Sequence, residues 1–132
     1  MTSCNHQKQV ISSDKAPAAI GPYSAAVSNG CSIFTAGQLG IDPATGDLVE
    51  GGIQAQTRQA LNNLKAVLEA GGSDLAHVIK CTVFLKDINE FGQMNEIYGQ
   101  YFTENFPARS AFQVAALPKG AAVEIEAVAI HA

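Results

Sequence analysis

Apolar residues recur along this chain at two different spacings, which predict where its helices and strands lie. Residues 54–70 carry leucine and valine at three- and four-residue intervals, a pattern typical of a helix with one buried face. Two glycines at 71–72 follow, and glycine commonly ends a helix. Residues 88–102 return to helical spacing, and Pro107 prevents that helix from continuing. The pattern therefore predicts two helices.

Short runs rich in β-branched and aromatic residues predict the strands. The hairpin signal is Asn29-Gly30, because both residues of such a tight turn need positive φ. We expect strands at residues 9–12, 24–27, 32–36, 78–85, 112–117 and 123–130. This order predicts an α/β (α+β) fold: a single sheet of about six strands with two helices on one face.

The last predicted strand suggests that the second face of the sheet is also covered. Residues 127–130 are apolar at every position, so both alternating faces are apolar there. Two helices can cover only one side of a sheet. A second copy of the chain is the simplest cover for the other side.

The composition is that of a globular protein. Hydrophobic residues make up 47% of the 132 residues and charged residues 15%, which is too apolar for a disordered chain. We expect one domain spanning residues 1–132, with a loose segment at 1–8. The net charge is −4 and the eight basic residues are scattered. A nucleic-acid partner is therefore not expected, because phosphate binding usually needs a basic stripe.

Targeting signals are not evident. No apolar run approaches the length that spans a bilayer, and residues 1–10 lack a hydrophobic secretory core. That segment also lacks arginine, which argues against a mitochondrial transit peptide. We expect a cytoplasmic protein that has no membrane partner.

Cysteine and histidine offer little chemistry. Cys4, Cys31 and Cys81 form no closely spaced pair, so no metal site is expected and the pattern suits a reduced compartment. Cys81 lies in an apolar run and is expected to be a small core residue. The three histidines, at 6, 77 and 131, are far apart and are expected to be solvated rather than catalytic.

Arg109 is the strongest single candidate for function. It follows Pro107 and precedes a predicted strand, and a guanidinium held in this way can form a two-pronged bond to a carboxylate. A surface or ion-paired arginine is the alternative.

Glu124 and Glu126 share one face of the last strand, so one of them could act as a general base, or both could be exposed or paired with a neighbouring chain. Tyr23 is either a pocket wall or a core aromatic.

Four separated segments together resemble the RidA (YjgF) family of reactive-intermediate deaminases. They are AAIGPYS at 18–24, GQ at 37–38, FPARS at 106–110 and VEIEA at 123–127. The resemblance runs from about Ile11 to the C-terminus, and QVAALPKG at 113–120 is similar to the animal-type members.

The resemblance implies a chorismate-mutase-like fold and a homotrimeric barrel with ligand sites between subunits. It also implies hydrolysis of reactive 2-imino acids or their enamines, such as 2-iminobutanoate and 2-iminopropanoate, to 2-keto acids and ammonia. No cofactor and no metal are implied, and the partners are a small 2-imino or 2-keto acid and two further copies of the chain.

The resemblance also assigns residues. Arg109 matches the arginine that holds the substrate carboxylate, and Glu124 matches the glutamate that holds or activates water. Tyr23, Gly37 and Asn95 match pocket positions. Two positions depart from the family pattern. Ala111 replaces a frequent cysteine, which leaves only its backbone carbonyl for substrate, and Ala36 replaces a frequent serine, which affects the expected substrate range.

Two other functions stay open at this stage. Animal-type relatives have been described as endoribonucleases or translation inhibitors, although RNA cleavage favours a cationic surface that this chain lacks. A non-catalytic small-carboxylate binding protein is the other alternative, because it would need Arg109 equally.

Overall fold

A computed structural model describes residue 4 and residues 6–132. Part of the N-terminal segment expected to be loose, namely residues 1–3 and 5, lies outside the described residues. In chain order the elements are β1 (Gln9–Ile11), β2 (Ala26–Ser28), β3 (Ser32–Thr35), β4 (Gln38–Leu39), α1 (Gly52–Ala70), η1 (Leu75–His77), β5 (Val78–Leu85), η2 (Ile88–Glu90), α2 (Phe91–Tyr101), β6 (Ala108–Gln113), η3 (Pro118–Gly120) and β7 (Val123–Ile130).

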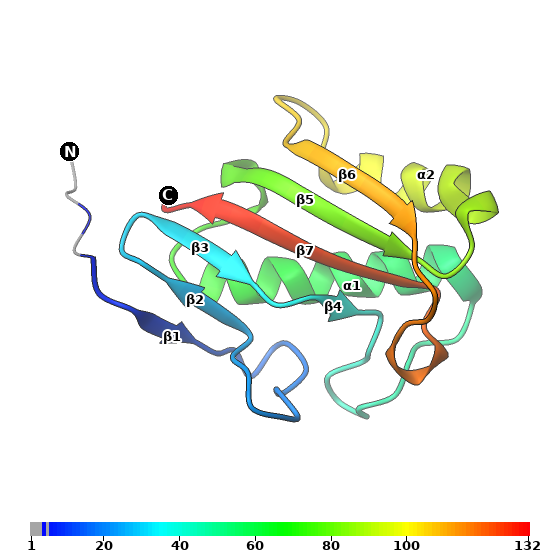
Figure 1. Cartoon of the computed structure of the whole chain (residues 1–132), viewed down its shortest axis with the longest axis horizontal. Helices are drawn as coiled ribbons and strands as arrows, with labels where there is room; N and C mark the ends of the chain where they lie inside the picture. The colour runs from blue at the N-terminus through cyan, green and yellow to red at the C-terminus, as the bar shows by residue number, and fades with distance from the viewer. Residues whose placement is uncertain (1–3, 5) are drawn as a thin grey trace.

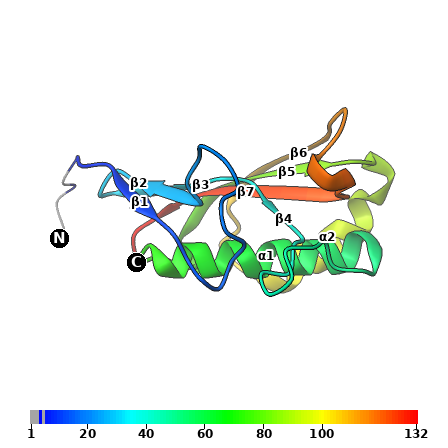
Figure 2. The same ribbon diagram turned by 90° about the horizontal axis from the view of Figure 1, so that it is seen from below.

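The strands form one sheet in the order β1-β2-β3-β7-β5-β6, and β4 also pairs with β7 (Figure 1). All pairs are antiparallel except β5–β6. Helix α2 connects these two parallel strands, because a tight turn cannot join strands that run the same way. Both helices lie on one face of the sheet (Figure 2). The predicted α+β class, with one sheet and two helices on one face, is confirmed.

Strand β7 shows how the two faces of the sheet differ. Its odd-numbered residues, from Val123 to Ala129, are buried against the helices, whereas Glu124, Glu126 and Val128 point the other way and are half-buried. We call this second side the open face. The exposed side chains of Phe34 and Phe112 also lie there, because Phe34 pairs with Val128 and Phe112 shares a row with Glu124 through β5. Nothing within the described chain covers these apolar groups.

The predicted strand at 112–117 is wrong in its position. Strand β6 is Ala108–Gln113, because Ala108 to Gln113 pair residue by residue with β5, starting at Lys80. Beyond it the backbone amide of Val114 still donates to Leu85 O, and the chain then turns into η3. Pairing with a distant strand outweighed the weak strand propensity of Arg109 and Ser110.

Other element boundaries differ in smaller ways. A seventh strand, β4, was not predicted because it is only two residues long. The second predicted helix is divided into η2 and α2, and Asp87 caps the first turn by accepting from the Asn89 amide. The strand expected at 24–27 is displaced to Ala26–Ser28. The strand 78–85 and the strand 123–130 are confirmed at both ends.

Cys81 is free and fully buried in the core, as expected. Cys4 and Cys31 lie side by side, with Cα atoms 4.9 Å apart and a sequence separation of 27 residues. That separation is within the range that a disulfide spans, so the reduced state expected for this pair stays a prediction. The β2–β3 turn brings Cys31 beside the N-terminal segment, and no local pattern indicates that contact.

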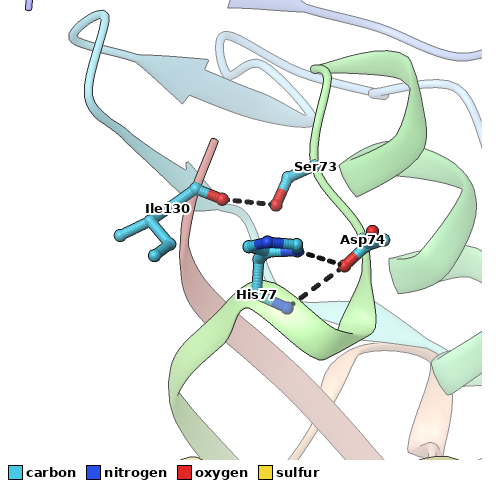
Figure 3. Close-up of polar contacts among 4 residues, drawn as sticks. All are labelled: Ser73, Asp74, His77 and Ile130. Atoms are coloured by element: carbon cyan, nitrogen blue, oxygen red, sulfur yellow. Dashed lines mark hydrogen bonds and ion pairs between the residues drawn. The ribbon is translucent and has the colours of Figure 1, made fainter. Parts of the chain in front are cut away.

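The connection from α1 to β5 holds His77, one of the three histidines expected to be solvated (Figure 3). Asp74 accepts from the His77 backbone amide and pairs with His77 Nδ1 at 2.7 Å, which lowers the pKa of Asp74. Ser73 Oγ donates to the Ile130 carbonyl at 2.5 Å. His77 is thus partly exposed and stabilises a turn.

In the described part of the chain, no helix is both long and apolar enough to cross a membrane.

Candidate functional site

Arg109 lies on the edge strand β6 and points toward helix α2. Its register partner on β5 is the buried Cys81, so its side chain leaves the sheet on the helix side. The guanidinium Nη1 donates to Asn95 Oδ1 at 2.6 Å. The guanidinium carbon lies 4.6 Å from the centre of the Tyr98 ring and 5.3 Å from that of Phe91. Arg109 and Asn95, both predicted as site residues, are therefore in direct contact.

The positive charge of Arg109 has no acidic partner. Within residue 4 and residues 6–132, the one ion pair joins Asp74 to His77. The ion-paired interpretation of Arg109 is therefore wrong for the single chain. A guanidinium has five N–H donors, and the amide oxygen of Asn95 accepts at only one of its nitrogens. A partly exposed guanidinium in this state is suited to binding a small anion.

Glu124, Gly37 and Tyr23 line a cavity of about 440 Å³ beside the open face. The Tyr23 side chain is 52% exposed, which identifies it as a wall of the cavity and not a core aromatic. Most of the other lining residues are apolar: Pro17, Ala18, Ala19, Ile20, Ala25, Leu39, Ile41, Pro43 and Pro118. The carboxylate of Glu124 is thus an acidic group in a largely apolar recess.

The recess raises the pKa of Glu124 above its ordinary value. Partial burial is the larger cause, because it disfavours the charged form, and repulsion from Glu126 adds to it. The two carboxylates lie on the same face of β7, two residues apart. A carboxylate with a raised pKa is a better proton acceptor than an ordinary one, which suits a general base.

Position 37 requires a glycine, because any side chain there would collide with the Glu124 carboxylate. A Cβ atom placed on Gly37 would lie 2.7 Å from Glu124 Cδ and 2.8 Å from Oε2, closer than side chains tolerate. Glycine at this position therefore leaves room for the carboxylate in the cavity.

Replacing Gly37 with alanine is expected to displace the Glu124 carboxylate and lower any activity that depends on it, with a smaller effect on folding because a side chain can rotate. The matched control is Gly99→Ala on α2, where the added Cβ meets nothing within 4 Å. Enzymatic rate and melting temperature of both variants give the answer. Equal activity of Gly37→Ala and Gly99→Ala would show that the Glu124 position is unimportant.

The predicted site residues fall into two groups on opposite faces of the sheet. Arg109 and Ala111 point to the helix side, where Arg109 contacts Asn95. Glu124 points to the open face. It pairs with Phe84 on β5, and Phe84 lies three residues after Cys81. Because side chains alternate along a strand, Phe84 and Glu124 face away from the helix side on which Cys81 is buried. One chain by itself therefore cannot place Arg109 and Glu124 around the same small molecule.

Sequence reasoning missed several residues that shape these two groups. Phe91 and Tyr98 were treated only as part of a helix, although their spacing from Asn95 puts all three on one stripe. Lys119 at the rim of the cavity donates to Gly46 O at 3.0 Å and has a positive φ of 59°.

Over the described residues, no three His, Cys, Asp or Glu side chains are grouped so that they could hold a metal ion.

Comparison with known proteins adds independent information. The family model described as Endoribonuclease L-PSP matches residues 13–131. The human 2-iminobutanoate/2-iminopropanoate deaminase is 57% identical over 124 residues, which cover 94% of this chain and 90% of the human protein.

Solved structures agree with the sequence match. RidA from the Antarctic bacterium Psychrobacter sp. PAMC 21119 is 48% identical, with a TM-score of 0.89 over 92% of this chain and 98% of that one. Escherichia coli TdcF, crystallised with bound serine, is 42% identical, with a TM-score of 0.89 over 94% of this chain and 99% of that one.

Proposed function

This chain belongs to the Endoribonuclease L-PSP family, and on that premise we propose that it is an enzyme that hydrolyses reactive 2-imino acids to 2-keto acids and ammonia. Its likeness to the human deaminase suggests 2-iminobutanoate and 2-iminopropanoate as substrates. The observation in this chain that carries the proposal is the unpaired guanidinium of Arg109, which suits a substrate whose one full charge is a carboxylate.

The proposed reaction needs little chemical assistance. Arg109 holds the substrate carboxylate by two parallel N–H···O bonds and thereby orients the C=N carbon. Glu124 accepts a proton from a water molecule as its oxygen adds to that carbon. Glu124 returns this proton to the nitrogen, and the hydroxyl of the adduct gives up the second. The C–N bond then breaks, the nitrogen leaves as ammonia, and the carbon keeps the oxygen as a ketone. Ala111 supplies no thiol, so the reaction proceeds without covalent attachment to cysteine.

The substrate site is proposed to form between two copies of the chain, within a homotrimer. The separation of Arg109 and Glu124 on opposite faces supports a site to which each of two subunits contributes one group. The exposed apolar side chains on the open face, including Phe34 and Phe112, support its burial against a neighbouring copy. A closed ring of three copies places every open face toward the centre.

Hybrid trimers test this arrangement. Arg109→Ala and Glu124→Gln are expected to be inactive separately, because each lacks one group at every site. When the two are co-expressed and mixed trimers are purified, the Arg109 of one variant meets the Glu124 of the other, and activity is expected to return. Mixed trimers that stay inactive, or a protein that is monomeric by light scattering, would contradict a site shared between subunits.

Ammonia release tests the enzymatic function itself. The protein is expected to accelerate ammonia release from freshly generated 2-iminobutanoate above the spontaneous rate. A protein that binds 2-ketobutanoate by calorimetry and yet fails to accelerate hydrolysis would be a carboxylate-binding protein. A parallel incubation with single-stranded RNA is expected to leave the RNA intact, and cleavage that Arg109→Ala abolishes would favour the endoribonuclease alternative.

The rate is expected to depend on pH through Glu124. Its carboxyl must be deprotonated to act as a base, so activity rises with pH through a pKa above that of an ordinary glutamate. Glu126→Gln removes the repulsion that raises this pKa, so the acid limb of the pH–rate profile should move to lower pH. The control is Glu69→Gln on α1, across the sheet from Glu124. An acid limb that stays in place, or moves to higher pH, would exclude the coupling.

A further inference from the structure

The Arg109 guanidinium is enclosed by three residues from one stripe of α2. Phe91, Asn95 and Tyr98 are four and three residues apart, so they follow one another along the same side of the helix. The amide oxygen of Asn95 accepts from Nη1, and the rings of Tyr98 and Phe91 lie 4.6 Å and 5.3 Å from the guanidinium carbon. Both ring distances are within the range of cation–π attraction.

The Tyr98 contact includes the face of the ring, whose centre lies 4.6 Å from the guanidinium carbon. The residue is only 6% exposed, and its hydroxyl is buried close to Cys81 and Arg109. Burial raises the pKa of Tyr98, and the nearby Cys81 adds to the effect, so the phenol stays neutral. The ring itself is held by Phe102, whose centre lies 4.7 Å away. The surface below Arg109 is therefore a fixed aromatic plane.

The aromatic plane can limit the orientations of the Arg109 side chain, which lies on the edge strand β6. An arginine on an edge strand has many rotamers, and binding a carboxylate by two prongs requires one orientation of a planar group. Two aromatic rings restrict the tilt of the guanidinium, and the Asn95 bond restricts its rotation within the plane. With these constraints in place, less side-chain entropy is lost when the substrate binds.

We propose that Phe91 and Tyr98 are positioning residues, which orient Arg109 so that its remaining N–H groups point toward the substrate carboxylate. This inference rests on the proposed function of Arg109. It predicts that changes at Phe91 and Tyr98 alter substrate affinity through Arg109, and that the tyrosine ring contributes more than the hydroxyl.

Kinetics of four variants tests the proposal in the intact protein. Phe91→Leu and Tyr98→Leu remove an aromatic face and are expected to raise KM for 2-iminobutanoate and Kd for 2-ketobutanoate about 3–30-fold each, with a smaller change in kcat. Tyr98→Phe keeps the ring face and removes only the hydroxyl, so KM should rise less than in Tyr98→Leu. The matched control is Tyr101→Leu, because Tyr101 lies on the same helix but bonds to Asn62 on α1.

A double-mutant cycle separates positioning from general destabilisation. In an Arg109→Lys background the planar group is already absent, so Phe91→Leu should have little further effect on KM. Phe91 is only half-buried, so this variant is expected to fold even if Tyr98→Leu does not. Equal effects of Phe91→Leu in the two backgrounds, or equal effects of Phe91→Leu and Tyr101→Leu, would overturn the proposal.

An NMR measurement keeps the proposal distinct from the function on which it rests. Relaxation of the Arg109 side-chain Nε–H bond reports how rigid the guanidinium is without any substrate. The order parameter is expected to fall in Phe91→Leu and to stay unchanged in Tyr101→Leu. A rigid Arg109 in Phe91→Leu would refute the positioning role, whereas a wild-type protein without deaminase activity would refute the proposed function alone.

Discussion

Arg109→Ala is expected to abolish detectable hydrolysis of 2-iminobutanoate. The substitution removes the one charged side chain of β6, and with it both proposed bonds to the substrate carboxylate. Arg109→Lys keeps the charge but loses the planar fork and the stacking on Tyr98, so activity should fall about 10–100-fold, as expected for the loss of one charge-assisted bond of about 1.5–3 kcal/mol. Steady-state kinetics with ammonia detection measures both effects.

Folding of the Arg109 variants is the necessary control. The side chain is partly exposed and forms no ion pair with any described residue, so melting temperature and oligomer size should change little. A structural arginine predicts the opposite, with residual activity that follows the folded fraction. If Arg109→Ala folds, assembles and hydrolyses the imine at the wild-type rate, the proposed site is wrong.

Glu124→Gln is expected to lower kcat about 10²–10⁴-fold, the usual contribution of a positioned general base. Glutamine keeps the size of the side chain, and Gly37 still leaves room for it. The affinity for 2-ketobutanoate should change little, because the ligand carboxylate is held by Arg109. Turnover measured at saturating imine, together with calorimetry, distinguishes these two effects.

The same substitution should slightly stabilise the fold near neutral pH. A carboxyl whose folded-state pKa is raised binds its proton more tightly in the folded protein, so its stabilising effect is present at low pH and is lost as pH rises through that pKa. Glutamine cannot ionise and therefore avoids the cost of a charge in the recess. A lower rate combined with an unchanged or higher melting temperature would identify Glu124 as functional. Unchanged turnover would exclude it and direct attention to Glu126.

The two longest strands were predictable because their information is local. Residues 78–85 and 123–130 are continuous runs of β-prone side chains, and the structure has strands at the same positions. Helix α1 was predictable for a similar reason, because its buried stripe repeats with the helical period. The strand β6 was misplaced because Arg109 and Ser110 have little local strand propensity and join the sheet only through β5.

The site was predictable in its residue types but not in its geometry. The motifs around Arg109 and Glu124 identified both residues, and the contact between Arg109 and Asn95 agrees with their common assignment. The supporting rings of Phe91 and Tyr98 could not be recognised in advance. Aromatic residues at helical spacing are more often part of a core, and only the packing of α2 beside β6 brings them to the guanidinium.

The sequence by itself determined the class of fold, the family and the candidate residues, because these depend on local periodicity and on short motifs. The tertiary structure alone decided which side of the sheet each candidate faces. Arg109 is aligned with Cys81 and Glu124 with Phe84, and such alignments between distant strands come from the packing of the whole sheet. A shift of one residue in either pairing would reverse the direction of the side chain. For that reason the position of Arg109 and Glu124 on opposite faces, and the shared site proposed from it, could be derived only from the folded chain.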